Sequence, residues 1–373
     1  MKYKRYSLSE LVTIKYGKNQ KKVLSADGTI PIYGTGGLMG YATEALYFQP
    51  SVLIGRKGTI GKVKYVDHPF WTVDTLFYTI VNSDIIIPKY LYYVMSQIDL
   101  NTYNEGTTIP SLRTETLNRL EFDIPSIDEQ KEILSYLEPI DEKIELNTAI
   151  NNNLEQQAMT LFKSWFINYE PFDRQVPTTW KCGVLGDFVE IKRGGSPRPI
   201  QNFLSDSGLH WLKISDATGI SSPFINEIKE YIIEEGLKKT IFLKAGSLVL
   251  SNSATPGLPK ILDIDTCIHD GWLYFPSSKF SNEYLYLYFK HIRDNLVALG
   301  NGSVFTNLKT DILKNYPTNL PTDEVLNEFD EIIKPIFSLI LSKTRESKRL
   351  TEVRDTLLPR LMSGELDVSD IDI

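Results

Sequence analysis

The chain has 373 residues, of which 42% are apolar and 11% aromatic, and its formal net charge at pH 7 is −7. This length accommodates two or three domains, and the apolar content excludes a disordered chain. No apolar run reaches the roughly 18 residues of a membrane span, and MKYKRYSLSE at the N-terminus lacks the apolar core of a secretory signal. Two isolated cysteines and four scattered histidines form no metal-ligand pattern, so we expect a cytoplasmic protein without a metal site.

In chain order, the first 125 residues alternate short β-rich runs with turns. SVLIG (51–55) and LFYTIV (76–81) are typical of buried strands, and PKYLYYVMSQI (88–98) predicts a helix whose tyrosines pack in the core. This region is therefore expected to be a mixed α/β globular domain.

A helical region follows from Ile133, where apolar residues recur with the 4-3-4-3 spacing of a coiled coil and turn polar at two central positions. Pro139 and Pro335 are expected to start a new helix or to kink an existing one, with a helix of about 27 residues following each. A sustained heptad implies a partner helix, although each helix could instead only cap its own domain. The predicted seam comprises Ile133, Leu137, Ile140, Ile144, Asn147, Asn151, Leu154, Leu161, Phe329, Ile333, Ile336, Ile340, Leu350 and Leu357.

The second half of the chain repeats the first. LSELVTIKYG (8–17) aligns with LGDFVEIKRG (185–194) at an offset of 177 residues. SVLIGRKGTIGKVKYVD (51–67) aligns with SLVLSNSATPGLPKILD (247–263) at an offset of 196. The second copy therefore carries about 19 extra residues between positions 195 and 246, and the chain is an internal duplication.

Charge alternates along the chain in step with this duplication. Residues 1–125 carry a charge of +3 and residues 171–320 carry +1, whereas residues 126–170 carry −6 and residues 321–373 carry −5. We predict globular domains at 1–125 and 171–320 and helical coiled-coil regions at 126–170 and 321–373. Acidic helices suit protein partners better than DNA.

The stretch VLIGRKGTIGKV (52–63) places glycines and basic residues after a strand, as in loops that hold phosphate. It is not a Walker A loop, because Gly55 and Gly61 lie one residue too far apart and Val63 replaces the hydroxyl after Lys62. A phosphate-binding enzyme that uses the 55–62 loop stays open as an alternative.

The second copy of this loop carries Asn252 and Ser253 where the first carries Arg56 and Lys57. An enzyme loop that binds phosphate would not be expected to lose its charges. A base-reading loop would, because Arg suits guanine O6 and N7 whereas Asn suits adenine N6 and N7. The two halves are therefore expected to read different DNA sequences.

Several motifs together resemble the specificity subunit of type I restriction–modification systems: IPIYGTGGLMGY (30–41), VLIGRKGTIG (52–61), WTVDTLFY (71–78), IPSIDEQKEIL (124–134) and LLPRLMSGELDV (357–368). The resemblance covers essentially the whole chain, including the duplication. It implies a mixed α/β (α+β) fold in which two target-recognition domains are separated by two long antiparallel coiled-coil helices with pseudo-twofold symmetry.

The resemblance also implies a function and partners. Each target-recognition domain would read half of a bipartite site in double-stranded DNA, and the helices would measure the spacer and dock two methyltransferase (modification) subunits. Restriction and translocase subunits would join the full complex. No cofactor is implied in this chain, because S-adenosylmethionine, ATP and Mg²⁺ would belong to the partner subunits, and no membrane is involved.

The sequence shows no methyltransferase N-P-P-[YF] run and no nuclease cluster, so we predict no catalytic residue. A coiled-coil adaptor that binds no DNA is a further alternative. Asp74 and Asp270 could accept from cytosine N4 or have a structural role beside a turn. The candidate DNA-binding residues are Lys15, Lys18, Asn19, Arg56, Lys57, Thr59, Lys62, Thr107, Thr108, Ser111, Arg113, Lys192, Arg193, Arg198, Asn252, Ser253, Ser303, Thr306, Asn307 and Lys309.

Overall fold

A computed structural model describes residues 3–300 and 307–366. Its contacts divide the chain into two compact units: unit 1 comprises Met1–Glu142 with Leu350–Ile373, and unit 2 comprises Lys143–Arg349. Each unit contains one globular region, called here a head, and segments of both long helices. The four segment boundaries predicted from the sequence stay a prediction.

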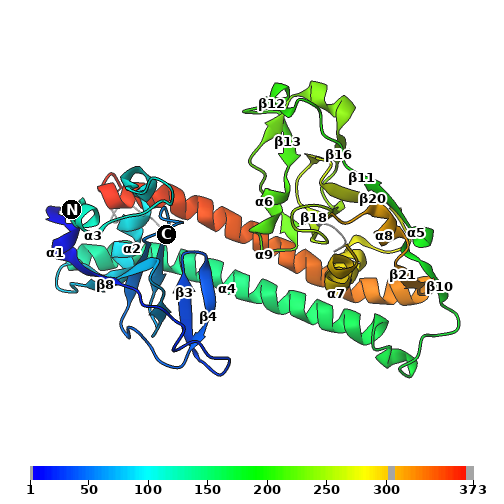
Figure 1. Cartoon of the computed structure of the whole chain (residues 1–373), viewed down its shortest axis with the longest axis horizontal. Helices are drawn as coiled ribbons and strands as arrows, with labels where there is room; N and C mark the ends of the chain where they lie inside the picture. Colours follow the sequence, from blue (N-terminus) through cyan, green and yellow to red (C-terminus); the bar gives the residue numbers. More distant parts are fainter. Residues whose placement is uncertain (1–2, 301–306, 367–373) are drawn as a thin grey trace. The chain divides into compact units, whose positions relative to one another are not determined.

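Head 1 is a mixed α/β domain (Figure 1). A four-stranded sheet has the order β2-β8-β5-β6 with antiparallel neighbours, and a three-stranded sheet has the order β4-β3-β7 with β3 parallel to β7. The pair β1–β9 brings the two ends of head 1 together. Its elements are β1 (Lys4–Ser7), α1 (Leu8–Leu11), β2 (Val12–Tyr16), β3 (Ile30–Gly34), β4 (Gly37–Ala42), β5 (Ser51–Gly55), β6 (Val63–Val66), β7 (Trp71–Thr72), β8 (Leu76–Val81), α2 (Pro88–Ser96), η1 (Leu100–Tyr103), α3 (Thr114–Asn118) and β9 (Glu121–Ile124).

The main core of unit 1 lies where α2 meets the four-stranded sheet and the long helices. The strands predicted at 51–55 and 76–81 and the helix predicted at 88–98 are confirmed. Tyr90 and Tyr93 of this helix are fully buried, as the sequence predicted. Leu137 of α4 and Leu361 of α9 belong to the same cluster of buried side chains.

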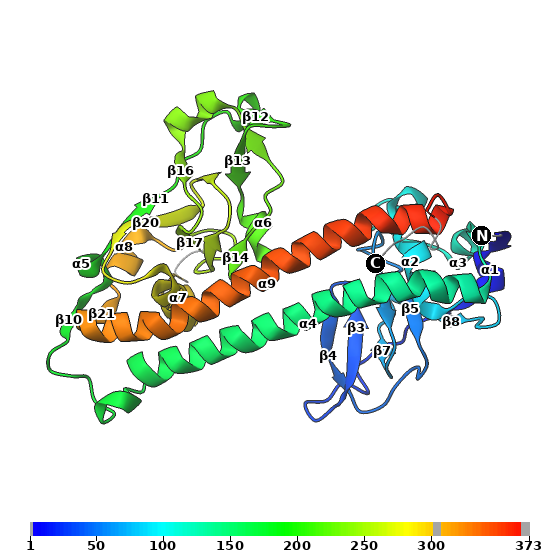
Figure 2. The ribbon, with the colours of Figure 1, turned by 180° about the vertical axis from the view of Figure 1, so that it is seen from behind.

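Head 2 repeats this plan with additional strands. One sheet has the order β11-β20-β17-β18-β14 and another has the order β12-β15-β13-β19-β16. Figure 2 shows α7 beside α9 in unit 2. The elements of head 2 are η2 (Glu170–Phe172), β10 (Lys181–Val184), α5 (Leu185–Phe188), β11 (Val189–Arg193), η3 (Ile200–Asn202), β12 (Leu204–Ser205), β13 (Leu209–Leu212), α6 (Ile214–Thr218), β14 (Phe224–Ile225), β15 (Tyr231–Ile232), η4 (Glu234–Lys239), β16 (Ile241–Leu243), β17 (Leu248–Ser251), β18 (Pro259–Leu262), β19 (Thr266–Ile268), β20 (Trp272–Ser278), α7 (Asn282–Gly300), α8 (Thr310–Lys314) and β21 (Pro317–Leu320).

The core of unit 2 is rich in aromatic side chains. Phe162 and Phe166 of α4 pack edge-on against Tyr284 of α7, with ring centroids 5.2 and 4.9 Å apart. Phe329 of α9 joins them, its ring centroid 4.7 Å from that of Phe166. Aromatic packing of this geometry adds roughly 0.5–1.5 kcal/mol per pair beyond area burial.

The two long helices are α4 (Ile127–Phe166) of 40 residues and α9 (Asp323–Ser363) of 41 residues. The expectation that a proline starts a new helix of about 27 residues is wrong, because Pro139 and Pro335 lie inside continuous helices. Pro139 is exposed, so the Ser135 carbonyl that loses its partner can bind water. A capping box starts α4: Ser126 Oγ accepts from Glu129 N–H at 3.4 Å, and Glu129 Oε2 accepts from Ser126 N–H at 2.9 Å.

The helix pair is antiparallel inside each unit. In unit 1, Asp141 of α4 contacts Arg354 of α9, and in unit 2 Asn147 contacts Glu346 while Asn151 contacts Thr344. All fourteen residues of the predicted seam are buried or half-buried. Eleven further side chains of these helices are buried outside that seam, which shows that each helix also packs against a head: Gln130, Leu134, Asp141, Glu155, Ala158, Phe162, Phe166, Leu326, Phe337, Leu358 and Leu361.

Candidate nucleic-acid interface

Loops of head 1 converge around the end of β5. Gly58 N–H donates to Pro110 O at 2.9 Å, and Leu112 N–H donates to Arg56 O at 2.9 Å, so the 55–62 loop lies against the 104–113 loop. Lys18 N–H donates to Thr72 O at 2.8 Å, which brings the turn after β2 to the β7–β8 connection. These segments, residues 15–19, 55–62, 72–76 and 104–113, are called loop cluster 1.

Arg56 is held inside this cluster rather than pointing freely outward. Its Nη1 donates to the main-chain oxygen of Asp74 at 2.9 Å, and its guanidinium lies 5.0 Å from the ring centroid of Tyr16. Lys57 is exposed, and its backbone bridges to Ser111. A guanidinium already bonded to a carbonyl oxygen is unlike the free cation of a phosphate-binding enzyme loop, so this geometry does not favour that alternative.

Lys15 is exposed on β2, and most other candidates of head 1 lie on exposed loops, namely Lys18, Asn19, Thr59, Lys62, Thr107 and Thr108. Asn19 Oδ1 accepts from Lys21 N–H at 2.9 Å, so this amide is engaged within its own turn. Arg113 Nε lies 3.0 Å from Glu105 Oε2 in an ion pair. The roles of these residues stay predictions.

Head 2 forms an equivalent arrangement, loop cluster 2, from residues 192–198, 251–254, 269–271 and 307–309. Leu308 N–H donates to Asn252 O at 2.7 Å, and Asn252 N–H donates to Gly271 O at 2.8 Å. With the 196-residue offset, the same two bonds in head 1 are Leu112 to Arg56 and Arg56 to Thr75. The duplication seen in the sequence is therefore a duplication of backbone geometry at both loop clusters.

The side chain of Asn252 is not available to a base edge, which corrects its prediction as a base reader. It is 4% exposed, and its Nδ2 donates to Asp270 O at 3.2 Å. Asn252 therefore holds the loop against the next connection, as Arg56 does in head 1. The neighbouring Ser253 and Ala254 are half-buried and exposed, and Ala254 has a left-handed backbone with φ of 57°.

The remaining candidates of head 2 differ in their engagement. Lys192 Nζ pairs with Glu190 at 2.8 Å, and hydrogen bonding to this carboxylate raises the pKa of Lys192. Arg198 has a side chain that is 79% exposed. Asn307 and Lys309 are exposed, whereas Ser303 and Thr306 lie outside the described residues.

A pocket of about 780 Å³ opens beside loop cluster 2. Its lining includes Arg198, Trp211, Lys213, Ala254 and His269. Burial lowers the pKa of His269, and its Nδ1 accepts from Gly271 N–H at 2.7 Å, so the ring is neutral and fixed in orientation at neutral pH. Trp211 and Lys213 were missed as site residues, although they fall inside the extra residues of the second copy.

In head 1, sequence reasoning missed two apolar side chains at the tip of the β3–β4 hairpin. Leu38 and Met39 are 54% and 55% exposed. A Cβ at Gly34 would meet both the Met39 side chain and Val73, so this tip adjoins the β7–β8 connection. Exposed apolar groups beside a candidate DNA-binding loop suit the methyl group of thymine. The signal was the GTGGLMG stretch, where glycines surround two residues with no core to enter.

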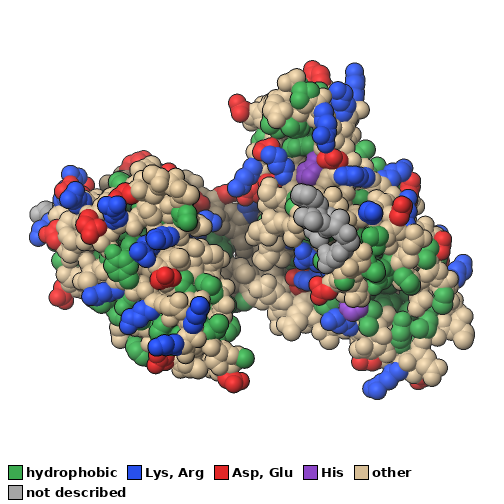
Figure 3. Space-filling view, in the orientation of Figure 1, with side chains coloured by type: hydrophobic (Ala, Val, Ile, Leu, Met, Phe, Trp, Pro, Cys, Tyr) green, Lys and Arg blue, Asp and Glu red, His purple; other side chains and the backbone are tan. Residues whose placement is uncertain are grey.

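Charge on the heads is mixed. On the face shown in Figure 3, Lys and Arg side chains lie among Asp and Glu side chains on both heads. Within residues 3–300 and 307–366, no group of three or more His, Cys, Asp and Glu side chains is placed to hold a metal ion. Among the same residues, no helix is long and apolar enough to cross a membrane.

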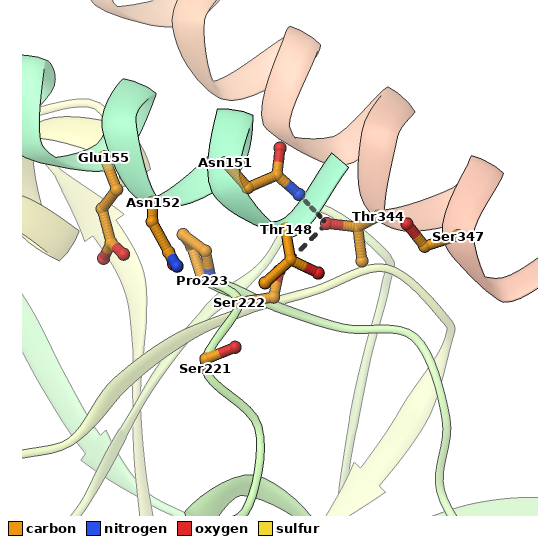
Figure 4. Close-up of a pocket in the computed structure, with 9 residues that line it drawn as sticks. All are labelled: Thr148, Asn151, Asn152, Glu155, Ser221, Ser222, Pro223, Thr344 and Ser347. Carbon is orange, nitrogen blue, oxygen red and sulfur yellow. Dashed lines mark hydrogen bonds between the residues drawn. The ribbon is translucent and has the colours of Figure 1, made fainter. Parts of the chain in front are cut away.

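The two polar positions of the predicted seam, Asn147 and Asn151, contact polar side chains of α9 inside unit 2. Asn147 is fully buried, and its Nδ2 donates to Glu346 Oε2 at 3.1 Å. Figure 4 shows Asn151 Nδ2 donating to Thr344 Oγ1, which is also bonded to Ser222 of head 2. These side chains border a pocket of about 110 Å³. A buried polar residue at a seam position fixes the register of a helix pair at a cost in stability.

The chain resembles known proteins over most of its length. The model of the family described as "Type I restriction modification DNA specificity domain" matches residues 1–156 and again 177–352. The "Type I restriction enzyme MjaIX specificity subunit" of Methanocaldococcus jannaschii is 26% identical, with 86% of this chain and 78% of that protein covered. The HindI specificity subunit of Haemophilus influenzae is also 26% identical, with 82% of this chain and 84% of that protein covered.

The crystal structure of a type I restriction–modification system S subunit from M. genitalium superimposes with a TM-score of 0.60 at 16% identity. It covers 97% of this chain and 96% of that chain, which shows a shared mixed α/β fold. The resemblance inferred from the sequence is confirmed, and relatives named as specificity subunits agree with a non-catalytic role. The chain belongs to the family of type I restriction–modification DNA specificity domains.

Proposed function

We propose that this chain is the DNA sequence-specificity subunit of a type I restriction–modification complex and that it recognises a bipartite, asymmetric site in double-stranded DNA. One observation carries the proposal: the two loop clusters share one backbone frame but carry different side chains. Two copies of one frame suit two similar tasks, and unlike side chains at the same positions suit unlike base sequences.

In this proposal the helices dock two methyltransferase subunits and, through them, the restriction and translocase subunits. S-adenosylmethionine, ATP and Mg²⁺ act in those partners and not in this chain, and the complex works in the cytoplasm. The long antiparallel coiled-coil helices set the spacer between the half-sites and relate the heads by a pseudo-twofold axis. The acidic charge of the helical regions and the polar contacts that fix their register support these roles.

A salt titration of DNA binding tests the proposal. The complex of this chain with its methyltransferase subunits is bound to duplex DNA at several salt concentrations, with and without the substitution Lys57→Ala. Loss of one phosphate contact should weaken binding to all sequences and reduce the slope of log K against log salt by about 1.

Lys238→Ala is the matched control, because Lys238 is equally exposed but lies in η4, outside both loop clusters. It should leave the slope unchanged. Equal slopes for wild type and Lys57→Ala would remove this loop from the interface. Absence of any DNA binding by the intact complex would support a structural adaptor instead.

A further inference from the structure

The two loop clusters contain an aspartate at the same aligned position, Asp74 in head 1 and Asp270 in head 2. Each lies in the connection that leads into β8 or β20. These strands pair with β5 and β17, which precede the loops at 55–62 and 251–254, called here the recognition loops. In both heads the main-chain oxygen of this aspartate accepts a hydrogen bond from a side chain, that of the first residue after β5 or β17, Arg56 or Asn252. The backbone therefore presents the two carboxylates in the same setting.

The arginine that donates to this carbonyl oxygen comes from a different position in each head. In head 1, Arg56 of the loop reaches it and stacks on Tyr16 at the end of β2. In head 2 the position aligned with Tyr16 is Arg193, whose Nε donates to Asp270 O. Each head thus supplies one arginine to the same oxygen, from the loop after β5 in head 1 and from the end of β11 in head 2.

The carboxylate of Asp270 forms a hydrogen bond and ion pairs with side chains of its own head. Its Oδ1 accepts from Ser196 Oγ at 2.7 Å, and its Oδ2 lies 3.3 Å from Arg198 Nη2 and 3.9 Å from Arg193 Nη2. These cationic partners and the serine hydroxyl lower the pKa of Asp270 although burial opposes the shift. A carboxylate in this position is an orienting group.

Arg198 is the side chain that Asp270 orients. The guanidinium has five N–H donors, of which the structure engages one with the carboxylate. Its side chain is 79% exposed and lines the 780 Å³ pocket of head 2. An exposed guanidinium fixed at one edge matches the two acceptors of guanine in the major groove.

The carboxylate of Asp74 is free in head 1. It is exposed, and within the described part of the chain its carboxylate makes no hydrogen bond or ion pair. Ser196 and Arg198 lie among the extra residues of the second copy, and the turn that follows β2 in head 1 carries Lys18 and Asn19 instead. Asn19 Oδ1 accepts from Lys21 N–H in its own turn at 2.9 Å, and no hydrogen bond joins Asn19 to Asp74. A free carboxylate has only acceptors, which suit the exocyclic amino group of cytosine.

We infer that this aligned aspartate has opposite tasks in the two heads: Asp74 contacts a base amino group directly in one half-site, whereas Asp270 positions Arg198 to contact a guanine in the other. This inference rests on the proposed function and names the specificity-determining side chains of that same site. Asp74 and Arg198 are the base-contacting residues, and Asp270 is a positioning residue.

The test uses the full chain in complex with its methyltransferase subunits and reads the methylated sequences from a library of randomised DNA. Asp74→Asn replaces an acceptor oxygen by a donor of nearly the same shape. It should change the preference at one position of one half-site by about 10- to 100-fold, the equivalent of one good base contact, and leave the other half-site unchanged. Asp74→Glu, which keeps the charge, should retain the preferred base.

Arg198→Lys should relax one guanine in the other half-site by a similar factor, because lysine cannot bind it in the same two-pronged way. Asp270→Asn should relax the same guanine more weakly and no other position. The controls Asp27→Asn and Asp206→Asn alter exposed aspartates outside both loop clusters and should leave every preference unchanged.

The thermal unfolding midpoints of all variants distinguish a loss of folding stability from a change in base preference. If wild type reads two unlike half-sites but Asp74→Asn and Arg198→Lys leave all base preferences unchanged, the inference is overturned while the proposed function stands. Uniform loss of methylation with a lower midpoint would also overturn it, because it would assign the aspartates a structural role. A wild-type complex that reads no split site would instead contradict the proposed function itself.

Discussion

Asp141 and Arg354 form a partly buried ion pair that joins the long helices inside unit 1, and the substitution Arg354→Leu tests how much it stabilises the protein. Arg354 Nη1 lies 2.8 Å from Asp141 Oδ1, and the two side chains are 23% and 10% exposed. Asp141 Oδ2 accepts from Tyr93 O–H at 2.6 Å and lies 3.8 Å from Lys89 Nζ. Burial and this hydrogen bond raise the pKa of Tyr93, so the phenol stays protonated and donates.

The magnitude follows from what remains after the substitution. Removing one partner of a buried pair costs roughly 3–5 kcal/mol, because the other charge is left buried. Asp141 would keep Tyr93 and the more distant Lys89, so we expect a loss near the lower end, about 3 kcal/mol. For a domain the size of unit 1 this corresponds to a drop of roughly 6–12 °C in the melting temperature.

Differential scanning calorimetry of the full chain measures this drop. Lys131→Ala is the control, because the Lys131–Asp128 pair is similarly short, at 3.0 Å, but its two side chains are 64% and 93% exposed. Pairs of that kind contribute at most about 1 kcal/mol. The double variant Asp141→Leu with Arg354→Leu should be more stable than Arg354→Leu alone. A melting temperature unchanged by Arg354→Leu would refute this account of the junction.

Three further outcomes follow from the structure. Burial lowers the pKa of Lys260 to about 8, so the unfolded chain binds more protons than the folded one up to about pH 10.4. The free energy of unfolding of wild type relative to Lys260→Met should therefore rise by about 1 kcal/mol per pH unit between pH 8 and 10. A difference in unfolding free energy that does not change with pH would contradict the burial of Lys260. Gly55→Ala should weaken DNA binding and lower the melting temperature, because the added Cβ would lie 2.1 Å from Thr59 O. In the control Gly36→Ala the added Cβ meets nothing within 4 Å, so DNA binding and the melting temperature should stay unchanged. Equal DNA binding and melting temperatures for the two variants would show that the loop adapts to the added Cβ. One heptad added to each long helix lengthens it by about 10 Å and should widen the spacer by about three base pairs without altering either half-site, so a changed half-site would refute the spacing role.

Local sequence patterns predicted the elements whose signals are local. Short apolar runs located β5 and β8, and the repeated spacing located the long helices and their polar central positions. The internal repeat predicted which loops would be equivalent. The hydrogen bonds of Arg56 and Asn252 to aligned carbonyl oxygens confirm the equivalence of the two recognition loops.

Features that depend on distant contacts could not be predicted in this way. The inward orientation of Asn252 depends on a carbonyl oxygen 18 positions further along the chain. The buried Glu155 lies outside the predicted seam because it accepts from Tyr286 and Lys290 of α7 rather than from the other long helix. The continuity of α4 through Pro139 depends on solvent access at that turn, which the 4-3-4-3 spacing does not encode.

The central claim is that two unlike heads read two half-sites. The most direct test is to co-express the chain with its methyltransferase subunits and to map methylated adenines across the DNA of the host. The account predicts an asymmetric split motif with a gap of several unread bases. A short continuous motif, or two identical half-sites, would contradict it.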